Sequence, residues 1–415
     1  MTDVEELLRD LVRIPSVNPR GQEGDGGETA VAEYVRDWLE RHGVQAELHE
    51  VLPGRCNVVA VVPGRRPEAI LLESHLDTVE TDGMTVDPYE GVVRDGRLYG
   101  RGACDAKGPL AAFMLAAAEL AGGEPPLHTL VLAGVCDEEH AYRGVLHLID
   151  ALADRRVVGA IVGEPTGLVP AVAHKGVVRY TVRTTGRAGH SSRPEEAVNA
   201  ITSMGPVIAH LATTAPDVPP HPLLGPATRS ITRIRGGTGP NTIPGTCEVD
   251  IDRRTLPGEG LEAVWEHDRA ELAAFGAELD PPFTVDPALD TRPDAAIVTA
   301  LGRALAAHGL PSTAAGMPFG TDASKLARAG IPSVVFGPGS VTDAHAATES
   351  VELAEVELAA RVVVTTVRET QGRAGAPQGR GAVSTCGSAA GRDQPHTTGR
   401  RPRAEDPAAG GRPCA

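Results

Sequence analysis

The order of apolar and polar positions predicts alternating helices and strands in the first 175 residues. Apolar side chains at three- and four-residue spacing, or in an Ala-rich run, predict helices over residues 4–14, 28–43, 108–120 and 142–153. Short apolar runs predict strands over residues 57–62, 69–72, 128–135 and 157–162. This alternation is typical of an α/β domain built on a mostly parallel sheet.

The pattern changes after about residue 175. Residues 177–185 alternate apolar and polar side chains, as a half-exposed strand does. The segments that follow are a helix, two strands and a helix, over 194–212, 230–235, 245–253 and 261–275. The α/β pattern then resumes with a helix over 295–308, the segment 324–329 and a strand over 333–336. We therefore predict an inserted α+β unit of the ferredoxin-like type.

The predicted domains follow from these changes. The α/β domain takes residues 1–175 and 288–370, and the inserted domain takes residues 176–287. Residues 371–415 are rich in Gly, Ala, Arg, Pro, Ser and Thr without periodicity, which predicts a disordered tail.

Length and charge narrow the class of protein. A chain of 415 residues suits two domains. Its net charge of -16 argues against nucleic acid or an anionic membrane as a partner.

No apolar run reaches the roughly 18 residues of a membrane span, and the acidic start is unlike a signal peptide. The six cysteines form no CxxC pair, which favours a reducing, cytoplasmic location.

Acidic and histidine side chains stand where the apolar runs end. They are His75 and Asp77, then Asp137, Glu138 and Glu139, then Glu164, and finally Asp343 and His345. Asp105 lies in a glycine-rich loop just before a predicted helix. Because the carboxyl ends of parallel strands meet at one edge of a sheet, we expect these groups to converge there.

So many carboxylates at one edge repel one another unless a cation lies between them. Two divalent metal ions meet this need best, with Asp105 as a bridge between ions roughly 3.5 Å apart. Histidine and carboxylate ligands suit Zn²⁺, with Co²⁺ and Mn²⁺ as alternatives. Taken singly, His75 is more often a structural histidine, and residues 137–139 are more often a solvated loop. The set as a whole indicates a metal-dependent hydrolase.

Four segments together resemble the M20 metallopeptidase and amidohydrolase family, and the resemblance extends over roughly residues 4–368. The segments are Ser74–Thr78, Gly100–Gly108, Asp137–Glu139 and Gly163–Thr166. The family includes acetylornithine deacetylase, succinyl-diaminopimelate desuccinylase, aminoacylase and glutamate carboxypeptidase. The resemblance implies a di-metal catalytic domain with an inserted domain that serves as a lid and in dimerisation.

The resemblance also implies which residues hold the two ions. One ion takes His75, Asp105 and Glu164. The other takes Asp105, Glu139 and His345. Asp105 is shared, in agreement with its expected bridging role.

Three further residues receive catalytic roles from the resemblance. Glu138 matches the general base. Asp77 matches a carboxylate behind the ligands, which orients and polarises the ligand imidazole. His190 matches a histidine of the inserted domain that reaches the active site of the partner subunit and stabilises the oxyanion. The chain is therefore expected to form a homodimer through residues 176–287.

Substrate contacts are expected from residues on the lid and on one loop of the catalytic domain. Asn241 matches a lid residue near the substrate, and Gly320 and Thr321 match substrate-side positions. Arg254 matches another such position and could pair with a substrate carboxylate. A role for Arg254 in supporting the fold is an equally good interpretation.

The resemblance implies hydrolysis of an N-acyl amino acid to a free amine and a carboxylate. A dipeptidase or carboxypeptidase on the same scaffold is the first alternative, because specificity lies in lid and loop side chains. A non-catalytic metal-dependent binding protein is a remote alternative, since Glu138 and every expected ligand are present. The sequence leaves the acyl group and the amino acid side chain of the substrate open.

Overall fold

A computed structural model describes residues 4–20 and 27–370 of the chain. The predicted tail over 371–415 lies outside these residues. The α/β domain, which the resemblance predicts to be the catalytic domain, contains helices α1 (Val4–Arg13), α2 (Thr29–Arg41), α3 (Lys107–Ala121), α4 (Arg143–Ala151), α7 (Ala296–Ala307), α8 (Ala323–Arg328) and α9 (Leu353–Glu369). Among the described residues, no helix is both long and apolar enough to cross a membrane.

A nine-stranded sheet forms the centre of this domain. Its strands are β1 (Gln45–Leu52), β2 (Arg55–Val62), β3 (Arg66–His75), β6 (His128–Val135), β7 (Val157–Val162), β8 (Ala171–His174), β16 (Leu289–Asp290), β17 (Ala315–Met317) and β18 (Ser333–Val335). The order is β1-β2-β6-β3-β7-β18-β8-β16, and β17 pairs with β8. The four central strands β6, β3, β7 and β18 run parallel, whereas β1, β2 and β16 pair antiparallel.

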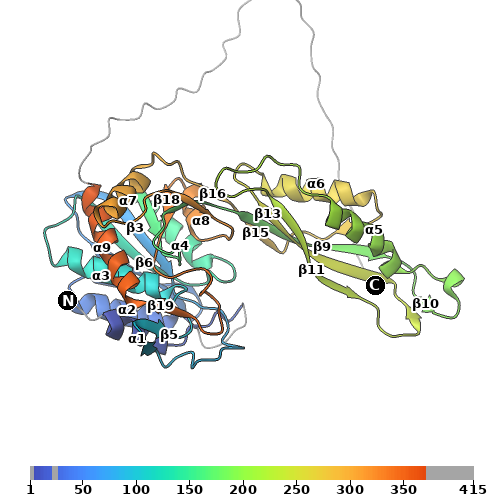
Figure 1. Ribbon diagram of the computed structural model, residues 1–415, viewed down its shortest axis with the longest axis horizontal. Coiled ribbons are helices and arrows are strands. Elements are labelled where there is room, and N and C mark those ends of the chain that lie inside the picture. The colour runs from blue at the N-terminus through green and yellow to red at the C-terminus, as the bar shows by residue number, and fades with distance from the viewer. Residues whose placement is uncertain (1–3, 21–26, 371–415) are drawn as a thin grey trace, which may run out of the picture. The chain divides into compact units, whose positions relative to one another are not determined.

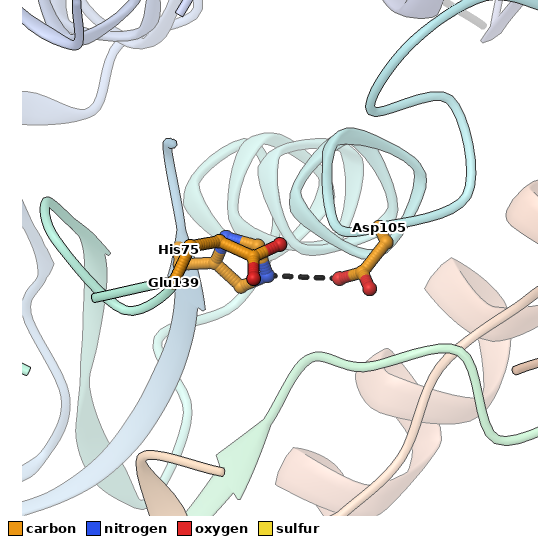
Figure 2. Close-up of side chains that lie close together, drawn as sticks. All are labelled: His75, Asp105 and Glu139. Atoms are coloured by element: carbon orange, nitrogen blue, oxygen red, sulfur yellow. Dashed lines mark hydrogen bonds and ion pairs between the residues drawn. The ribbon is translucent and has the colours of Figure 1, made fainter. Parts of the chain in front are cut away.

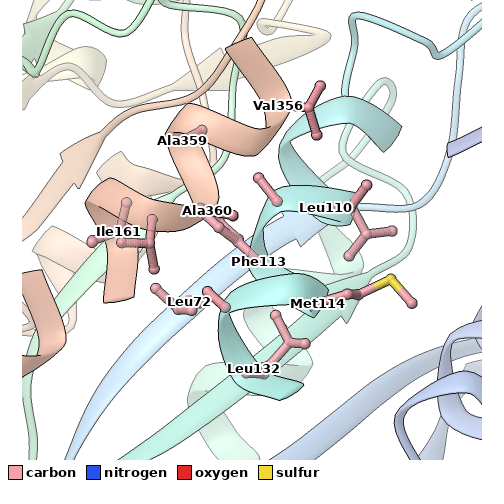
Figure 3. Packing of buried hydrophobic residues seen from close by; sticks show 14 of the residues in the cluster. Leu72, Leu110, Phe113, Met114, Leu132, Ile161, Val356, Ala359 and Ala360 are labelled. Carbon is pink, nitrogen blue, oxygen red and sulfur yellow. The ribbon is translucent and has the colours of Figure 1, made fainter. Parts of the chain in front are cut away.

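Alternate residues of the central strands pack into separate cores on the two faces of the sheet. In β3, Ile70 and Leu72 belong to one core and Leu71 to the other. Helices α1, α2, α3, α7 and α9 cover the first face, and α4 and α8 cover the second (Figure 1). Figure 3 shows the first core, where Leu72 and Ile161 lie beside Phe113 of α3. The apolar runs are therefore buried on both faces, and their polar ends emerge at the sheet edge.

The inserted domain has its own antiparallel sheet and its own core. Five strands form the sheet, with order β11-β13-β9-β14 and β15 paired to β9. They are β9 (Gly176–Thr185), β11 (Thr228–Gly236), β13 (Thr246–Thr255), β14 (Glu278–Leu279) and β15 (Thr284–Asp286). Helices α5 (Ala200–Thr213) and α6 (Leu261–Ala273) pack on it. A short ribbon of β10 (Gly189–His190) and β12 (Thr242–Ile243) completes this domain.

The predicted fold class, a mostly parallel α/β domain with an inserted α+β domain, is confirmed. The chain enters the inserted sheet after His174 and leaves it after Asp286. The extent 176–287 for the inserted domain stays a prediction.

The structure differs from the predicted elements in several places, and two of these differences have a clear physical reason. The helix predicted over 194–212 begins only at Ala200, because the Asn199 side chain accepts from the N–H groups of Ile201 and Thr202 and caps it there. Helix α9 was not predicted. Its run of Val and Thr residues weakens the helical signal, and packing against α3 and α7 holds it.

Candidate metal centre

The five predicted metal ligands come from five separate segments and meet at one edge of the large sheet. His75 is the last residue of β3, and Glu164 follows β7. Asp105 lies in the turn before α3, Glu139 lies after β6, and His345 lies in the loop after β18. We call these five residues the catalytic-domain cluster. The positions at strand ends follow directly from the sequence pattern.

Asp105 lies between the two histidines of this cluster. Its Oδ1 is 2.9 Å from His75 Nε2, and its Oδ2 is 3.2 Å from His345 Nε2. Glu139 Oε1 is 3.0 Å from His345 Nε2, and Glu164 Oε1 is 3.9 Å from His75 Nε2. Figure 2 shows His75, Asp105 and Glu139, whose ligand atoms lie within 4.8 Å of one another. The Asp105 carboxylate thus has one oxygen near His75 and the other near His345, which belong to the two predicted ligand sets.

Apart from the two histidines, no cationic side chain of the described residues pairs with these carboxylates. Within residues 4–20 and 27–370, no arginine or lysine forms an ion pair with Asp105, Glu139 or Glu164. Burial raises the pKa of Glu139 and of Glu164. Hydrogen bonds to Asp105 and Glu139 raise the pKa of His345 to about 10. Imidazole and carboxylate donors without an internal cation are the set that fits divalent ions such as Zn²⁺.

The predicted general base, Glu138, is next to this cluster in the chain. Its residue is half-buried, and burial raises the pKa of its carboxyl group well above the usual range. A carboxyl group whose pKa is raised by burial is suited to accept and return a proton. Its catalytic role stays a prediction.

Asp77 is buried behind the cluster and contacts both His75 and the loop that carries Glu138 and Glu139. Its carboxylate accepts from the backbone N–H of Glu138 at 3.1 Å and of Glu139 at 3.0 Å. The nearest distance from its carboxylate to His75 Nδ1 is 3.7 Å, whereas that nitrogen lies 2.9 Å from the Asp77 carbonyl oxygen. With Nδ1–H donating to the carbonyl, Nε2 is left free as the ligand nitrogen. The Asp77 carboxylate therefore mainly holds the loop.

Sequence analysis missed a residue that supports Asp77. Asn18 Nδ2 donates to Asp77 Oδ2 at 2.7 Å and to Asp137 Oδ1 at 3.1 Å. Asp137 is fully buried and also pairs with Arg143 at 2.5 Å, so it supports the loop. Asn18 lies in the loop after α1, and no spacing in the sequence links it to the cluster.

His190 and Asn241 lie side by side on the β10–β12 ribbon. His190 pairs with Thr242, and the N–H of Ser191 donates to the Asn241 carbonyl at 3.0 Å. Both residues are exposed, and His190 Nδ1 lies 2.7 Å from Ser192 Oγ. All these bonds lie within the inserted domain. The ribbon thus presents the two predicted lid residues together.

The other predicted substrate residues already have partners in the chain. Arg254 Nε donates to Asp252 at 2.7 Å. Thr321 is fully buried, and its hydroxyl accepts from the Ala323 N–H at 3.2 Å. Gly320 is half-buried, and a Cβ atom there would lie 2.1 Å from an Asp286 oxygen. Substrate contacts by Arg254, Gly320 and Thr321 stay predictions.

Comparison with known proteins shows a family match over most of this chain and many similar sequences. The sequence profile of peptidase family M20/M25/M40 matches residues 71–369. The acetylornithine deacetylase of Proteus mirabilis is 31% identical over 367 residues, which are 85% of this chain and 92% of the relative. That of Myxococcus xanthus is 34% identical over 347 residues, 78% of this chain and 87% of the relative. The YXEP protein of Bacillus subtilis, described as a dinuclear metal-binding peptidase, is 21% identical with a TM-score of 0.67. The match covers 88% of this chain and 97% of that protein.

Proposed function

Because the chain belongs to peptidase family M20/M25/M40 and is a metallopeptidase or amidohydrolase that acts on C–N amide bonds, we propose that it removes the acyl group from an N-acyl amino acid. The products are a free amine and a carboxylate. The proposal follows the acetylornithine deacetylases, which align along most of this chain at about 30% identity. N-acetylornithine is therefore the first substrate to test.

The observation that carries this function is the catalytic-domain cluster. Its carboxylates are buried or half-buried without an arginine or lysine partner among the described residues. We propose that His75, Asp105 and Glu164 hold one divalent ion, and that Asp105, Glu139 and His345 hold the other. Zn²⁺ is the expected metal, with Co²⁺ and Mn²⁺ as alternatives.

The side chains of this chain then divide the work of hydrolysis. When bound, the ions supply Lewis-acid activation of a water molecule and of the amide carbonyl. Glu138 takes a proton from the water and returns it to the leaving amine. The hydrogen bonds from Glu138 N–H and Glu139 N–H to Asp77 keep this base and its neighbouring ligand in a fixed geometry.

We propose that the inserted domain forms a homodimer and that His190 from a second copy stabilises the oxyanion. Strand β11 supports a dimer, because it is the edge of its sheet and most of its residues are exposed. A mixing experiment tests the shared site: Glu138→Gln chains are combined with His190→Ala chains. In a mixed dimer one site has both residues intact, so the mixture should regain about a quarter of wild-type activity. No regain, with mixed dimers present, contradicts the shared site.

A substrate panel tests the proposed reaction. Zinc- and cobalt-loaded protein is given N-acetyl, N-succinyl and N-formyl amino acids, N-acetylornithine among them, together with dipeptides. Preference for N-acyl amino acids supports the deacylase. Preference for dipeptides establishes instead the dipeptidase or carboxypeptidase alternative.

We also propose a cytoplasmic location, which the four unpaired cysteines of the described residues support.

A further inference from the structure

A second buried carboxylate, Glu349, contacts the loop that carries Asp105. Its residue is fully buried, and its Oε1 accepts from the backbone N–H of Cys104 and of Asp105, each at 3.0 Å. Its other oxygen, Oε2, lies 2.5 Å from Arg101 Nη1. Arg101 is itself only 3% exposed. Both oxygens of the Glu349 carboxylate are thus bonded, and Oε1 bonds only to backbone N–H groups of the turn that carries Asp105.

Glu349 also joins this turn to the segment that carries His345. Its backbone carbonyl accepts from the Gly100 N–H at 3.0 Å. Directly after it, β19 (Ser350–Glu352) pairs with β5 (Arg97–Tyr99). Two segments that lie far apart in the chain are therefore fixed to each other next to the 3.2 Å contact between Asp105 and His345.

The arrangement repeats what Asp77 does on the other side of the cluster. Each carboxylate accepts from two consecutive backbone N–H groups, and in each pair one N–H belongs to a proposed ligand. Hydrogen bonds to a carboxylate are short and strong, and partners behind metal ligands set ligand geometry. Asn18 supports Asp77, and Arg101 supports Glu349.

We propose that Glu349 is a positioning residue for the metal centre, which sets the place of the bridging carboxylate of Asp105 relative to His345. The proposal rests on the proposed di-metal function. Because Glu349 acts through Asp105, its loss should weaken metal binding and lower kcat, while KM changes little. A residue that only stabilised the fold would lower the melting temperature without changing the affinity for metal.

The matched variants are Glu349→Gln and Asp268→Asn. Each converts a buried, arginine-paired carboxylate to an amide, and Asp268 lies in the inserted domain, where it pairs with Arg229 at 3.0 Å. In Glu349→Gln the amide nitrogen faces either Arg101 or the two backbone N–H groups, so a donor opposes a donor in both orientations. We expect roughly 10- to 100-fold weaker binding of Zn²⁺ for Glu349→Gln and wild-type affinity for Asp268→Asn.

Zn²⁺ binding is measured by calorimetric titration of metal-free protein, beside kcat, KM and thermal unfolding. Wild-type Zn²⁺ affinity in folded Glu349→Gln overturns the proposal. The double variant Glu349→Gln/Arg101→Met removes the opposed donors and leaves the amide oxygen to accept both N–H groups. It should bind Zn²⁺ more tightly than Glu349→Gln, with Arg101→Met as its control; affinity no better than that of Glu349→Gln contradicts a role through these bonds. If wild-type protein binds no Zn²⁺, the proposed function fails instead.

Discussion

Two clusters of histidine and carboxylate side chains differ in how their charge is balanced. The catalytic-domain cluster consists of His75, Asp105, Glu139, Glu164 and His345. The second, the inserted-domain cluster, consists of His267, Asp268 and Glu271, whose ligand atoms also lie within 4.8 Å of one another. By residue type alone, both satisfy the requirements of a metal site.

The inserted-domain cluster already has its cation. Arg229 Nη1 lies 3.0 Å from Asp268 and 2.6 Å from Glu271, and the Tyr180 hydroxyl donates to Asp268 at 2.6 Å. In the catalytic-domain cluster the only positive partners are histidines, within the part of the chain that the structure describes. We infer that the better candidate for a metal site is the cluster whose buried carboxylates lack an arginine or lysine partner among the described residues. Proximity of suitable residue types is not sufficient.

The largest expected effect separates the two clusters by activity. Glu138→Gln should lower kcat by about 10³-fold, because the amide cannot take the proton from water, while metal content stays at the wild-type value. Asp268→Asn, in the inserted-domain cluster, should leave kcat/KM within about twofold at temperatures where it is folded. Steady-state kinetics and metal analysis measure both. Near wild-type turnover in Glu138→Gln would remove Glu138 from the mechanism.

The second prediction removes the cation from the inserted-domain cluster. Arg229→Met leaves Asp268 and Glu271 without their buried partner, so the free energy of unfolding should fall by about 3 kcal/mol. Chemical denaturation measures the loss. Zn²⁺ should restore part of the stability in Arg229→Met, because the cluster then resembles the other one. A variant as stable as wild type would show that Arg229 is not the balancing charge.

The third prediction concerns removal of metal and its dependence on pH. The pKa values of Glu139, Glu164 and His345 are raised in the metal-free protein, that of His345 to about 10. These three groups therefore hold extra protons in the folded metal-free protein, and their contribution to its stability falls as pH rises from about 5 towards 10. Asp105, whose pKa is lowered by hydrogen bonds from the histidines despite its burial, acts in the opposite sense only below pH about 4.

Metal ions need deprotonated ligands, so their binding strengthens over the same pH range. At a Zn²⁺ concentration about 100 times the Kd, stabilisation of about 2.7 kcal/mol should raise the melting temperature by roughly 5 °C. Calorimetry of metal-free and Zn²⁺-loaded protein should show this difference growing between pH 6 and pH 9. If the difference in melting temperature between Zn²⁺-loaded and metal-free protein became smaller as pH rises, it would contradict the description of the catalytic-domain cluster as carboxylates without an arginine or lysine partner.

The smallest effect is expected for His267→Ala. His267 is exposed, and the two carboxylates beside it are already paired with Arg229. Stability should change by less than about 0.5 kcal/mol, and metal content should not change. Loss of a bound ion from this variant, measured by elemental analysis, would show that the inserted-domain cluster is a metal site after all.

The sequence pattern predicted the fold class and a meeting of acidic and histidine side chains at the sheet edge for one physical reason, whereas the choice of the five cluster residues came from the family resemblance. An apolar run buried on both faces of a parallel sheet has to end at the sheet edge, so the residue type at its end is visible in the sequence. His75 and Glu164 stand at such ends. Two short apolar runs, those of β6 and β7, were predicted with their observed bounds.

The residues that hold the cluster in place could not be found in this way. Asn18 and Glu349 act through contacts between segments that are far apart in the chain, and neither lies in an apolar run that predicts a strand. The hydrogen bonds of the Asp77 carboxylate come from backbone N–H groups, and the pattern of side chains in the sequence does not predict such bonds. Helix α9 was missed because its packing, more than its composition, makes it a helix.

Counting the metal ions bound per chain tests the central claim most directly. Metal-free wild-type protein and the variants Glu139→Gln and Glu271→Gln are titrated with Co²⁺, and hydrolysis of an N-acetyl amino acid is followed in parallel. We predict two ions and activity for wild type and for Glu271→Gln, and loss of one ion and of activity for Glu139→Gln. Wild-type protein that binds no ion, or Glu139→Gln that keeps both ions and its activity, would contradict the account.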